Sequence, residues 1–184
     1  MYGKGECESV LGEILSKYPR ESYYLVSKMP AYAFSNRDRI IKEFFNQLKR
    51  CRLEYFDFYM IQGISEKNEE SFYKSDIVNV LIELKEEGFI KNLGFSFHGT
   101  PNLLNDIISL YNWDFVMLQL NYFDWEFSQG KELYSICYEN NLPIFVMKPN
   151  KGGLLLKYGP DLSFAWLNQL EGIYMILSGM NEIE

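Results

Sequence analysis

Residues 90–124 read IKNLGFSFHGTPNLLNDIISLYNWDFVMLQLNYFD, and this stretch decides the fold because two apolar runs flank a helical segment. The apolar runs are Asn92–His98 and Phe115–Asn121. Between them, Pro101–Leu110 places apolar residues at helical period, and Thr100 is its predicted N-cap. Both runs are apolar along their whole length, so we expect strands buried on both faces, as in a parallel sheet.

Polar residues follow where these two strands are predicted to end: Ser96, His98, Gln119 and Asn121. In parallel α/β folds, ligands bind at the carboxyl ends of the strands. The stretch therefore predicts a ligand site at that edge of the sheet. Buried structural hydrogen bonds are the alternative role for the same side chains.

The rest of the chain continues this alternation of strands and helices. The other predicted strands are Tyr23–Ser27, Phe56–Ile61, Ile144–Met147 and Ile173–Leu177. The other predicted helices are Glu6–Tyr18, Arg37–Arg52, Asp76–Gly88, Glu132–Asn140 and Ser163–Leu170. Strands recur roughly every 25–35 residues, which is typical of a βα-repeat protein. No glycine-rich phosphate loop is present, which favours a (β/α)-barrel over a doubly wound nucleotide-binding sheet.

Length and composition predict a single domain over residues 1–184, because 47% of the residues are hydrophobic. A net charge of -7 argues against binding to nucleic acid or to an anionic membrane. No apolar run reaches the roughly 18 residues needed to span a bilayer, and the start does not resemble a signal peptide. Cys7, Cys51 and Cys137 lack metal-binding spacing, so we expect reduced thiols and a cytoplasmic location.

Several motifs, in order along the chain, are similar to those of the aldo-keto reductase family. They are Tyr2-Gly3-x-Gly5, Ser27-Lys28, Leu53–Tyr59, Glu87–Ser96, Asp114–Asn121, Lys148-Pro149-x-x-Gly152-Gly153 and Leu177–Met180. The resemblance implies an α/β fold of the (β/α)8 TIM-barrel type, here incomplete, with about six βα units and the first two strands missing. Phe95–His98 together with Val146–Pro149 most resembles the branch often fused to a C-terminal iron–sulfur domain. The cysteine motif of that domain is missing, so no cluster is predicted.

The resemblance implies reduction of a small aldehyde or ketone, with hydride from NADP or NAD and a proton from a tyrosine. Tyr2 and Lys28 occupy the positions of the family's catalytic tyrosine and lysine. A nearby ammonium favours the phenolate and so makes a tyrosine a better proton donor. The family's catalytic histidine is replaced by Gln62, which donates a hydrogen bond but cannot transfer a proton. The position of the family's catalytic aspartate falls before Met1.

The resemblance also implies how a nicotinamide cofactor binds. Ser96, Gln119 and Asn121 match residues that hold the nicotinamide carboxamide, and Met147 stands where an aromatic commonly stacks. Lys148, Gly152 and Gly153 resemble the turn beside the pyrophosphate, and Ser178 with Gly179 resembles the turn near the adenosine phosphate. No Lys or Arg follows that turn, so NADP and NAD both remain open.

Two functions remain open from the sequence alone. The first is an NAD(P)H-dependent reductase that uses Tyr2, Lys28 and Gln62 as its catalytic residues. The second is a catalytically impaired fragment that at most binds nucleotide, which the substitution by Gln62 and the missing aspartate favour.

Overall fold

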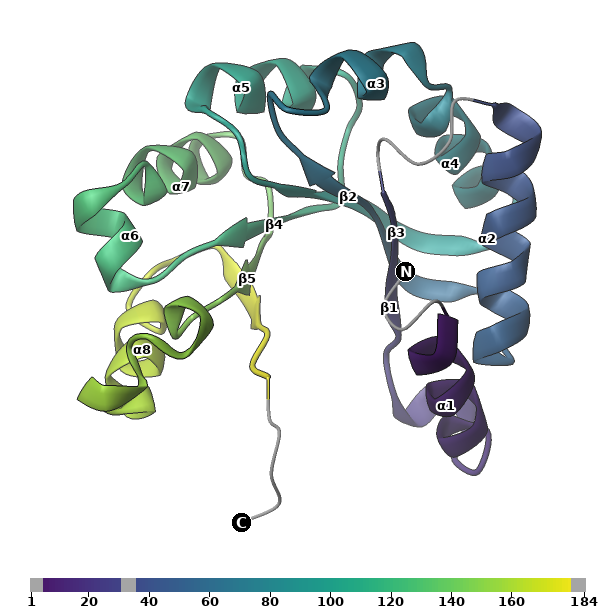
Figure 1. Ribbon diagram of the computed structural model, residues 1–184, viewed down its shortest axis with the longest axis horizontal. Helices are drawn as coiled ribbons and strands as arrows, with labels where there is room; N and C mark the ends of the chain where they lie inside the picture. The colour runs from purple at the N-terminus through teal and green to yellow at the C-terminus, as the bar shows by residue number, and fades with distance from the viewer. Residues whose placement is uncertain (1–4, 31–35, 180–184) are drawn as a thin grey trace. The chain divides into compact units, whose positions relative to one another are not determined.

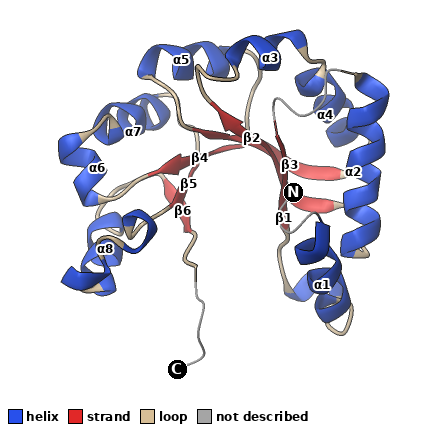
Figure 2. Cartoon of the chain, viewed as in Figure 1, coloured by secondary structure: helices blue, strands red, loops and turns tan. Residues whose placement is uncertain are grey.

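The computed structural model of the chain describes residues 5–30 and 36–179. Within these residues it contains six strands that alternate with helices (Figures 1 and 2). The strands are β1 (Val26–Pro30), β2 (Phe56–Ile64), β3 (Ile90–Phe97), β4 (Phe115–Gln119), β5 (Ile144–Met147) and β6 (Ile173–Ile176). Their order in the sheet is β1-β2-β3-β4-β5-β6. Strands β1 and β2 are parallel, as are β4, β5 and β6.

Helix α1 precedes the first strand, and the other α-helices follow strands along the chain. The α-helices are α1 (Glu6–Leu15), α2 (Arg37–Cys51), α3 (Glu69–Lys74), α4 (Ile77–Glu86), α5 (Pro101–Ser109), α6 (Tyr122–Phe127), α7 (Gly130–Glu139) and α8 (Pro160–Leu167). The short 3₁₀ helices are η2 (Arg20–Ser22), η3 (Lys151–Gly153) and η4 (Leu156–Tyr158). Within the described residues, no helix is long and apolar enough to cross a membrane.

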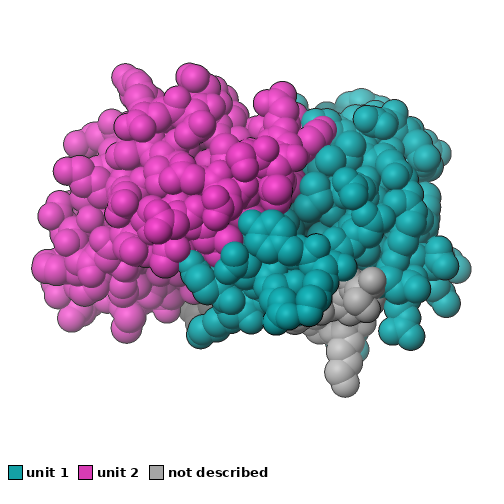
Figure 3. Space-filling view, turned by 90° about the horizontal axis from the view of Figure 1, so that it is seen from above, with its two compact units in different colours: residues 1–95 teal, residues 96–184 magenta. Residues whose placement is uncertain are grey.

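The chain divides into two compact units, Met1–Phe95 and Ser96–Glu184 (Figure 3). In the first unit, an aromatic cluster of Phe44, Phe56 and Tyr59 joins α2 to β2, with ring centroids 5.0–5.7 Å apart. Helix α1 approaches α2 closely because Gly12 has no side chain: a Cβ there would lie 2.4 Å from the Arg50 carbonyl oxygen.

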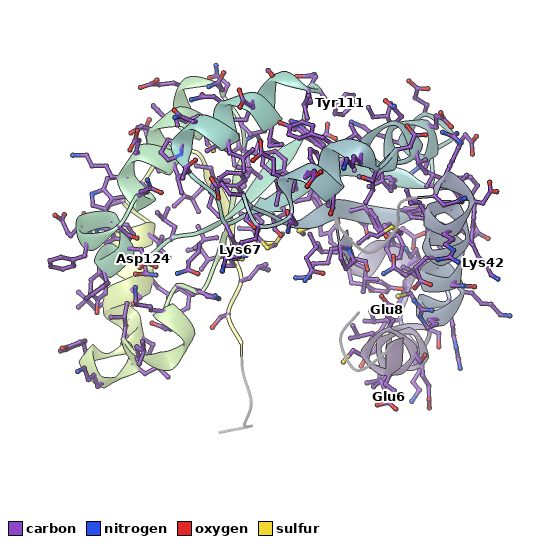
Figure 4. All side chains as sticks on the ribbon, turned by 45° about the horizontal axis from the view of Figure 1, so that its top comes forward. Glu6, Glu8, Lys42, Lys67, Tyr111 and Asp124 are labelled. Carbon is purple, nitrogen blue, oxygen red and sulfur yellow. The ribbon has the colours of Figure 1, made fainter. Side chains whose placement is uncertain are left out.

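A buried polar network fixes the helices of the first unit to its strands. The Tyr59 hydroxyl donates to Gln47 Oε1, and Gln47 Nε2 donates to Glu8 Oε1 (2.9 Å) and to the Lys28 carbonyl oxygen (3.1 Å). Glu8, labelled in Figure 4, also pairs with Arg50 at 2.6 Å. Burial and the nearby carboxylates raise the pKa of Tyr59 well above its usual value, so its hydroxyl stays protonated.

In the second unit, β4, β5 and β6 form the sheet, and Phe115 stacks on Phe145 with ring centroids 4.5 Å apart. Cys137 of α7 is buried, and burial raises the pKa of its thiol to about 12. In the first unit, burial likewise raises the pKa of Cys51 to about 11, whereas Cys7 is exposed.

The predicted parallel strands and alternating helices are confirmed. Several boundaries differ from the sequence prediction. The first strand is Val26–Pro30 instead of Tyr23–Ser27, and β2 continues to Ile64, so Gln62 lies inside the strand. The strand predicted over Phe115–Asn121 ends at Gln119, and a short helix that was not predicted begins after Asn121.

Helix α1 leaves most of its apolar side chains exposed. Its apolar residues Val10 and Ile14 are 55% and 47% exposed. The helix turns Glu8 and Gly12 toward α2 instead, because Glu8 pairs with Arg50 and Gly12 allows the close approach.

Candidate functional site

Lys28 of β1 and Gln62 of β2 lie on one face of these two strands in the first unit. Lys28 is the register partner of Met60, and Gln62 is that of Pro30. Side chains alternate along a strand, so Lys28, Met60 and Gln62 point to the same face. Tyr59 points to the opposite face, where it contacts α2. The predicted catalytic lysine and its predicted glutamine neighbour therefore share the face turned away from α2.

Gln119 ends β4 in the second unit, and Met147 ends β5. They are register partners, so their side chains share one face at the carboxyl ends of these strands. Both side chains are partly exposed there. Two of the predicted cofactor-binding residues are thus brought together as expected, whereas Ser96 is buried near the end of β3.

Asp124 is the centre of the polar contacts at this edge, and only 6% of it is exposed (labelled in Figure 4). Gln119 Nε2 donates to Asp124 Oδ2 at 2.8 Å, and Asn121 Nδ2 donates to the same oxygen at 2.7 Å. The Lys151 ammonium binds the other oxygen, Oδ1. Asp124 therefore accepts hydrogen bonds from the end of β4, from the N-cap of α6 and from the loop after β5.

The charge of Asp124 is stabilised where it is buried. Burial alone raises the pKa of a carboxyl group, but the hydrogen bonds from Gln119, Lys151 and Asn121 outweigh it and hold the pKa of Asp124 below its usual value. The carboxylate is therefore ionised at neutral pH, and its partner Lys151 supplies the compensating positive charge.

Asn121 is fully buried and is the N-cap of helix α6. Its Oδ1 accepts from the Asp124 backbone N–H at 2.9 Å, which caps the helix, and its Nδ2 also donates to the Lys148 carbonyl oxygen at 3.2 Å. The side chain predicted to touch a nicotinamide is thus engaged in holding α6 and the loop after β5. For Asn121, the structural role weighed in the sequence analysis accounts for the contacts of both polar side-chain atoms.

A cavity of about 190 Å³ lies beside Asp124, in the second unit. His98, Gln119 and Asp124 line it together with the start of α7, including Gln129 and Gly130. Gln119 and His98, which the sequence placed at the ends of two strands, therefore reach the same cavity.

A larger cavity, of about 330 Å³, lies at the ends of β5 and β6. Its lining includes all five residues of the two predicted phosphate-binding turns: Lys148, Gly152, Gly153, Ser178 and Gly179. Gly152 has a positive φ of 65°, a conformation that glycine adopts without strain, and a Cβ there would meet nothing within 4 Å.

Asn150 also lines this larger cavity, and its Oδ1 is buried without a hydrogen-bond partner. A buried acceptor of this kind is costly unless a donor reaches it. The cavity therefore combines an exposed lysine, two residues without side chains and an unsatisfied acceptor, which suits a phosphorylated ligand that also carries hydroxyl groups.

The predicted proton donor Tyr2 lies outside the described residues. Three contributors were not predicted: Asp124, Asn150 and Lys151. The spacing Asn121-x-x-Asp124 is a capping signal that could have revealed the first. No local signal marks Lys151, because its partner is distant in sequence. Within the described part of the chain, no cluster of three or more His, Cys, Asp or Glu residues is arranged to hold a metal ion.

Comparison with known structures shows the fold. An aldo-keto reductase from Bacillus halodurans in its holo form has a TM-score of 0.79 and 18% identity, covering 96% of this chain and 68% of that chain. An aldo/keto reductase from Klebsiella pneumoniae in complex with NADP and acetate has a TM-score of 0.76 and 18% identity, covering 97% and 67%. The six described strands, against eight in a closed barrel, form an incomplete barrel of the same TIM-barrel type, as predicted.

Sequence comparison gives the family. An NADH-specific methylglyoxal reductase from Escherichia coli (strain K12) is 26% identical over 175 residues, covering 84% of this chain and 51% of the relative. The chain thus spans about half the length of this curated relative. The model of the Aldo/keto reductase family matches residues 1–164, which is most of the sequence. The chain therefore belongs to the aldo/keto reductase family.

Proposed function

We propose that this chain carries the cofactor site and part of the catalytic site of an NAD(P)H-dependent reductase that converts an aldehyde or ketone to an alcohol. The observation that carries the proposal is the cavity of about 330 Å³, whose lining includes both predicted phosphate-binding turns. The family membership of the chain supports the same conclusion.

The residues around this cavity fit a dinucleotide. Lys148 offers a cation to the pyrophosphate, and the backbone at Gly152 and Gly153 can approach it closely because no Cβ intervenes. The unsatisfied Asn150 Oδ1 would accept a hydrogen bond from a ribose hydroxyl or an adenine amine. Gln119 and Met147 would hold the nicotinamide end, at the carboxyl ends of β4 and β5.

The bound cofactor would supply hydride to the carbonyl carbon. Tyr2 would donate a proton to the carbonyl oxygen, and Lys28 would favour the phenolate that remains. Gln62, on the same face as Lys28, would donate a hydrogen bond that orients the substrate oxygen.

Cofactor binding is the first test. Titration of the chain with NADH and with NADPH, followed by fluorescence, should saturate for at least one of them. Lys148→Gln should weaken binding about tenfold, because a charged hydrogen bond to the pyrophosphate is lost. Lys157→Gln, at an exposed lysine of η4, is the matched control and should bind like the parent. Absence of saturation with both cofactors would contradict the proposal.

Turnover is the second test. Methylglyoxal is a suitable first substrate, since the Escherichia coli relative is a methylglyoxal reductase, and oxidation of the cofactor can be followed by absorbance. Tyr2→Phe and Lys28→Met should each lower the rate at least about 100-fold while leaving the Kd of the cofactor unchanged. Lys42→Met, at an exposed position of α2, should leave the rate unchanged.

A second candidate function is nucleotide binding without turnover. Gln62 favours it, because its amide cannot transfer a proton at neutral pH. Saturable binding of NADH or NADPH together with no oxidation of the cofactor by any aldehyde tested would support this candidate over the first. A cytoplasmic location remains a prediction from the sequence under either function.

A further inference from the structure

The buried carboxylate of Asp124 has no assigned part in the proposed reaction, yet it connects the two ends of the proposed cofactor site. One of its oxygens accepts from Gln119, which is the residue proposed to hold the nicotinamide. The other accepts from Lys151, which lies in the loop that lines the larger cavity. Both contacts lie within the second unit of the chain.

The contact with Gln119 determines which way its amide points. An amide can rotate by half a turn and exchange its donor and acceptor ends at little cost unless a partner fixes it. The carboxylate of Asp124 is an acceptor only, so it holds the Nε2 end of Gln119 at 2.8 Å. The Oε1 end is then presented in a fixed direction, as an acceptor for the amide nitrogen of a nicotinamide carboxamide.

Lys151 connects this arrangement to the loop after β5. It stands between Lys148 and Gly152, both of which line the larger cavity. Its ammonium binds Asp124 and also lies 4.2 Å from the centroid of the Phe123 ring. The Lys148 carbonyl oxygen accepts from Asn121, so the same loop is held at two points.

We propose that Asp124 is a positioning residue for the cofactor: its carboxylate, held in place by Lys151, orients the Gln119 amide toward the nicotinamide carboxamide. This inference rests on the proposed function, since it assigns a role within the same cofactor site. Asp124 is only 6% exposed, and its partners stabilise a charge that would be destabilising there if it were unpaired.

A purely structural ion pair would stabilise the fold without favouring one part of the ligand. The two roles differ in which half of the cofactor they affect. Gln119 is proposed to contact only the nicotinamide half. Loss of its orientation should therefore weaken binding of the cofactor but not binding of ADP-ribose, which lacks that half. A structural role would change the affinity for both ligands by the same factor.

The test therefore measures the Kd of the preferred cofactor and the Kd of ADP-ribose, or its 2′-phosphate for NADPH, in the parent chain and in Asp124→Asn. The asparagine keeps one acceptor oxygen but replaces the other by an NH₂ group. This donor then faces either the Lys151 ammonium or the amide donors of Gln119 and Asn121. We expect the Kd of the cofactor to rise about tenfold and that of ADP-ribose to change less than about twofold. Glu126→Gln, the same change at an exposed position of α6, should alter neither Kd.

Each outcome decides between the roles. Equal weakening of both ligands, or no weakening of either, would overturn the inference while leaving the proposed function intact. Failure of the parent chain to bind the cofactor would instead overturn the proposed function, and the inference with it. If Asp124→Asn does not fold, Lys151→Gln replaces it. The Kd of the cofactor should again rise more than the Kd of ADP-ribose, and an unchanged ratio of the two would overturn the inference.

Discussion

Lys28 of β1 and Gln62 of β2 point to the same face of two neighbouring parallel strands. Lys28 pairs with Met60, and Gln62 lies two residues further along β2. Their strands are held to α2 from the opposite face, where Gln47 accepts from Tyr59 and donates to the Lys28 carbonyl oxygen. The side chains proposed for catalysis are thus carried on backbone that a buried polar network supports, an arrangement that limits their movement.

Replacing Gln62 by histidine should increase the turnover of an aldehyde about tenfold, because an imidazole can transfer a proton as well as donate a hydrogen bond. Gln62→Leu, which removes the donor, should lower turnover below that of the parent. Steady-state kinetics with a fixed, saturating cofactor concentration measure both effects. Equal rates in all three proteins would show that the residue at this position does not contact the substrate.

Tyr59→Phe should lower the free energy of unfolding by about 1–3 kcal/mol, since it leaves the buried Oε1 of Gln47 without its donor. Urea unfolding followed by circular dichroism measures the change. Tyr24→Phe is the matched control: its side chain is 76% exposed, and the loss of its hydroxyl should change the stability by less than about 0.5 kcal/mol. A Tyr59→Phe protein as stable as its control would contradict the described network.

Gly12→Ala should destabilise the first unit although alanine is the better helix former. The gain in helix propensity is about 1 kcal/mol, whereas a Cβ placed 2.4 Å from the Arg50 carbonyl oxygen forces two helix backbones apart. We expect a net loss of about 1–2 kcal/mol in the same unfolding experiment. Glu13→Ala, at the next and exposed position of α1, gives the baseline for propensity. A Gly12→Ala protein more stable than the parent would show that α1 does not approach α2 so closely.

Acid should weaken the second unit through Asp124. Its pKa in the folded chain lies below that of the unfolded chain, so its stabilising effect is complete above about pH 4 and is lost as the pH falls through the folded value. The charged group that contacts it is Lys151, and His98 lines the same cavity. Unfolding should be compared between pH 5 and pH 2.5.

Asp124→Asn supplies the control for this pH dependence. It should be less stable than the parent at pH 5, and the difference should shrink as the pH falls, because protonation of the parent removes the same charge. A difference that stays constant over this range would show that the ionised form of Asp124 contributes nothing to the stability of the folded chain.

Local signals in the sequence located the elements of the fold well. Asn36 caps α2 by accepting from the backbone N–H groups of Asp38 and Arg39, a role typical of an asparagine directly before a helix, and Ile144–Met147 is a strand with the predicted bounds. Both features depend on neighbouring residues only. The end of β2 was placed too early because Gln62 pairs with Pro30 of β1, a contact between residues distant in sequence.

The candidate site was only partly predictable for the same physical reason. The two glycine turns and Gln119 follow strands directly, so their positions could be read from the order of the elements. Asp124 and Lys151 are 27 positions apart in the sequence. From the residues next to each of them in the sequence, both would be predicted to be solvent-exposed charges. Likewise, Val10 is exposed because α1 packs through Gly12, which no helical periodicity reveals.

The different environments of the three cysteines have a practical consequence. Only a thiolate reacts rapidly with a maleimide, and the raised pKa values of Cys51 and Cys137 keep these buried thiols protonated at neutral pH. The exposed Cys7 on α1 is therefore the natural attachment point for a single fluorophore. A label at Cys7 can thus report on the unfolding of the first unit without an engineered cysteine.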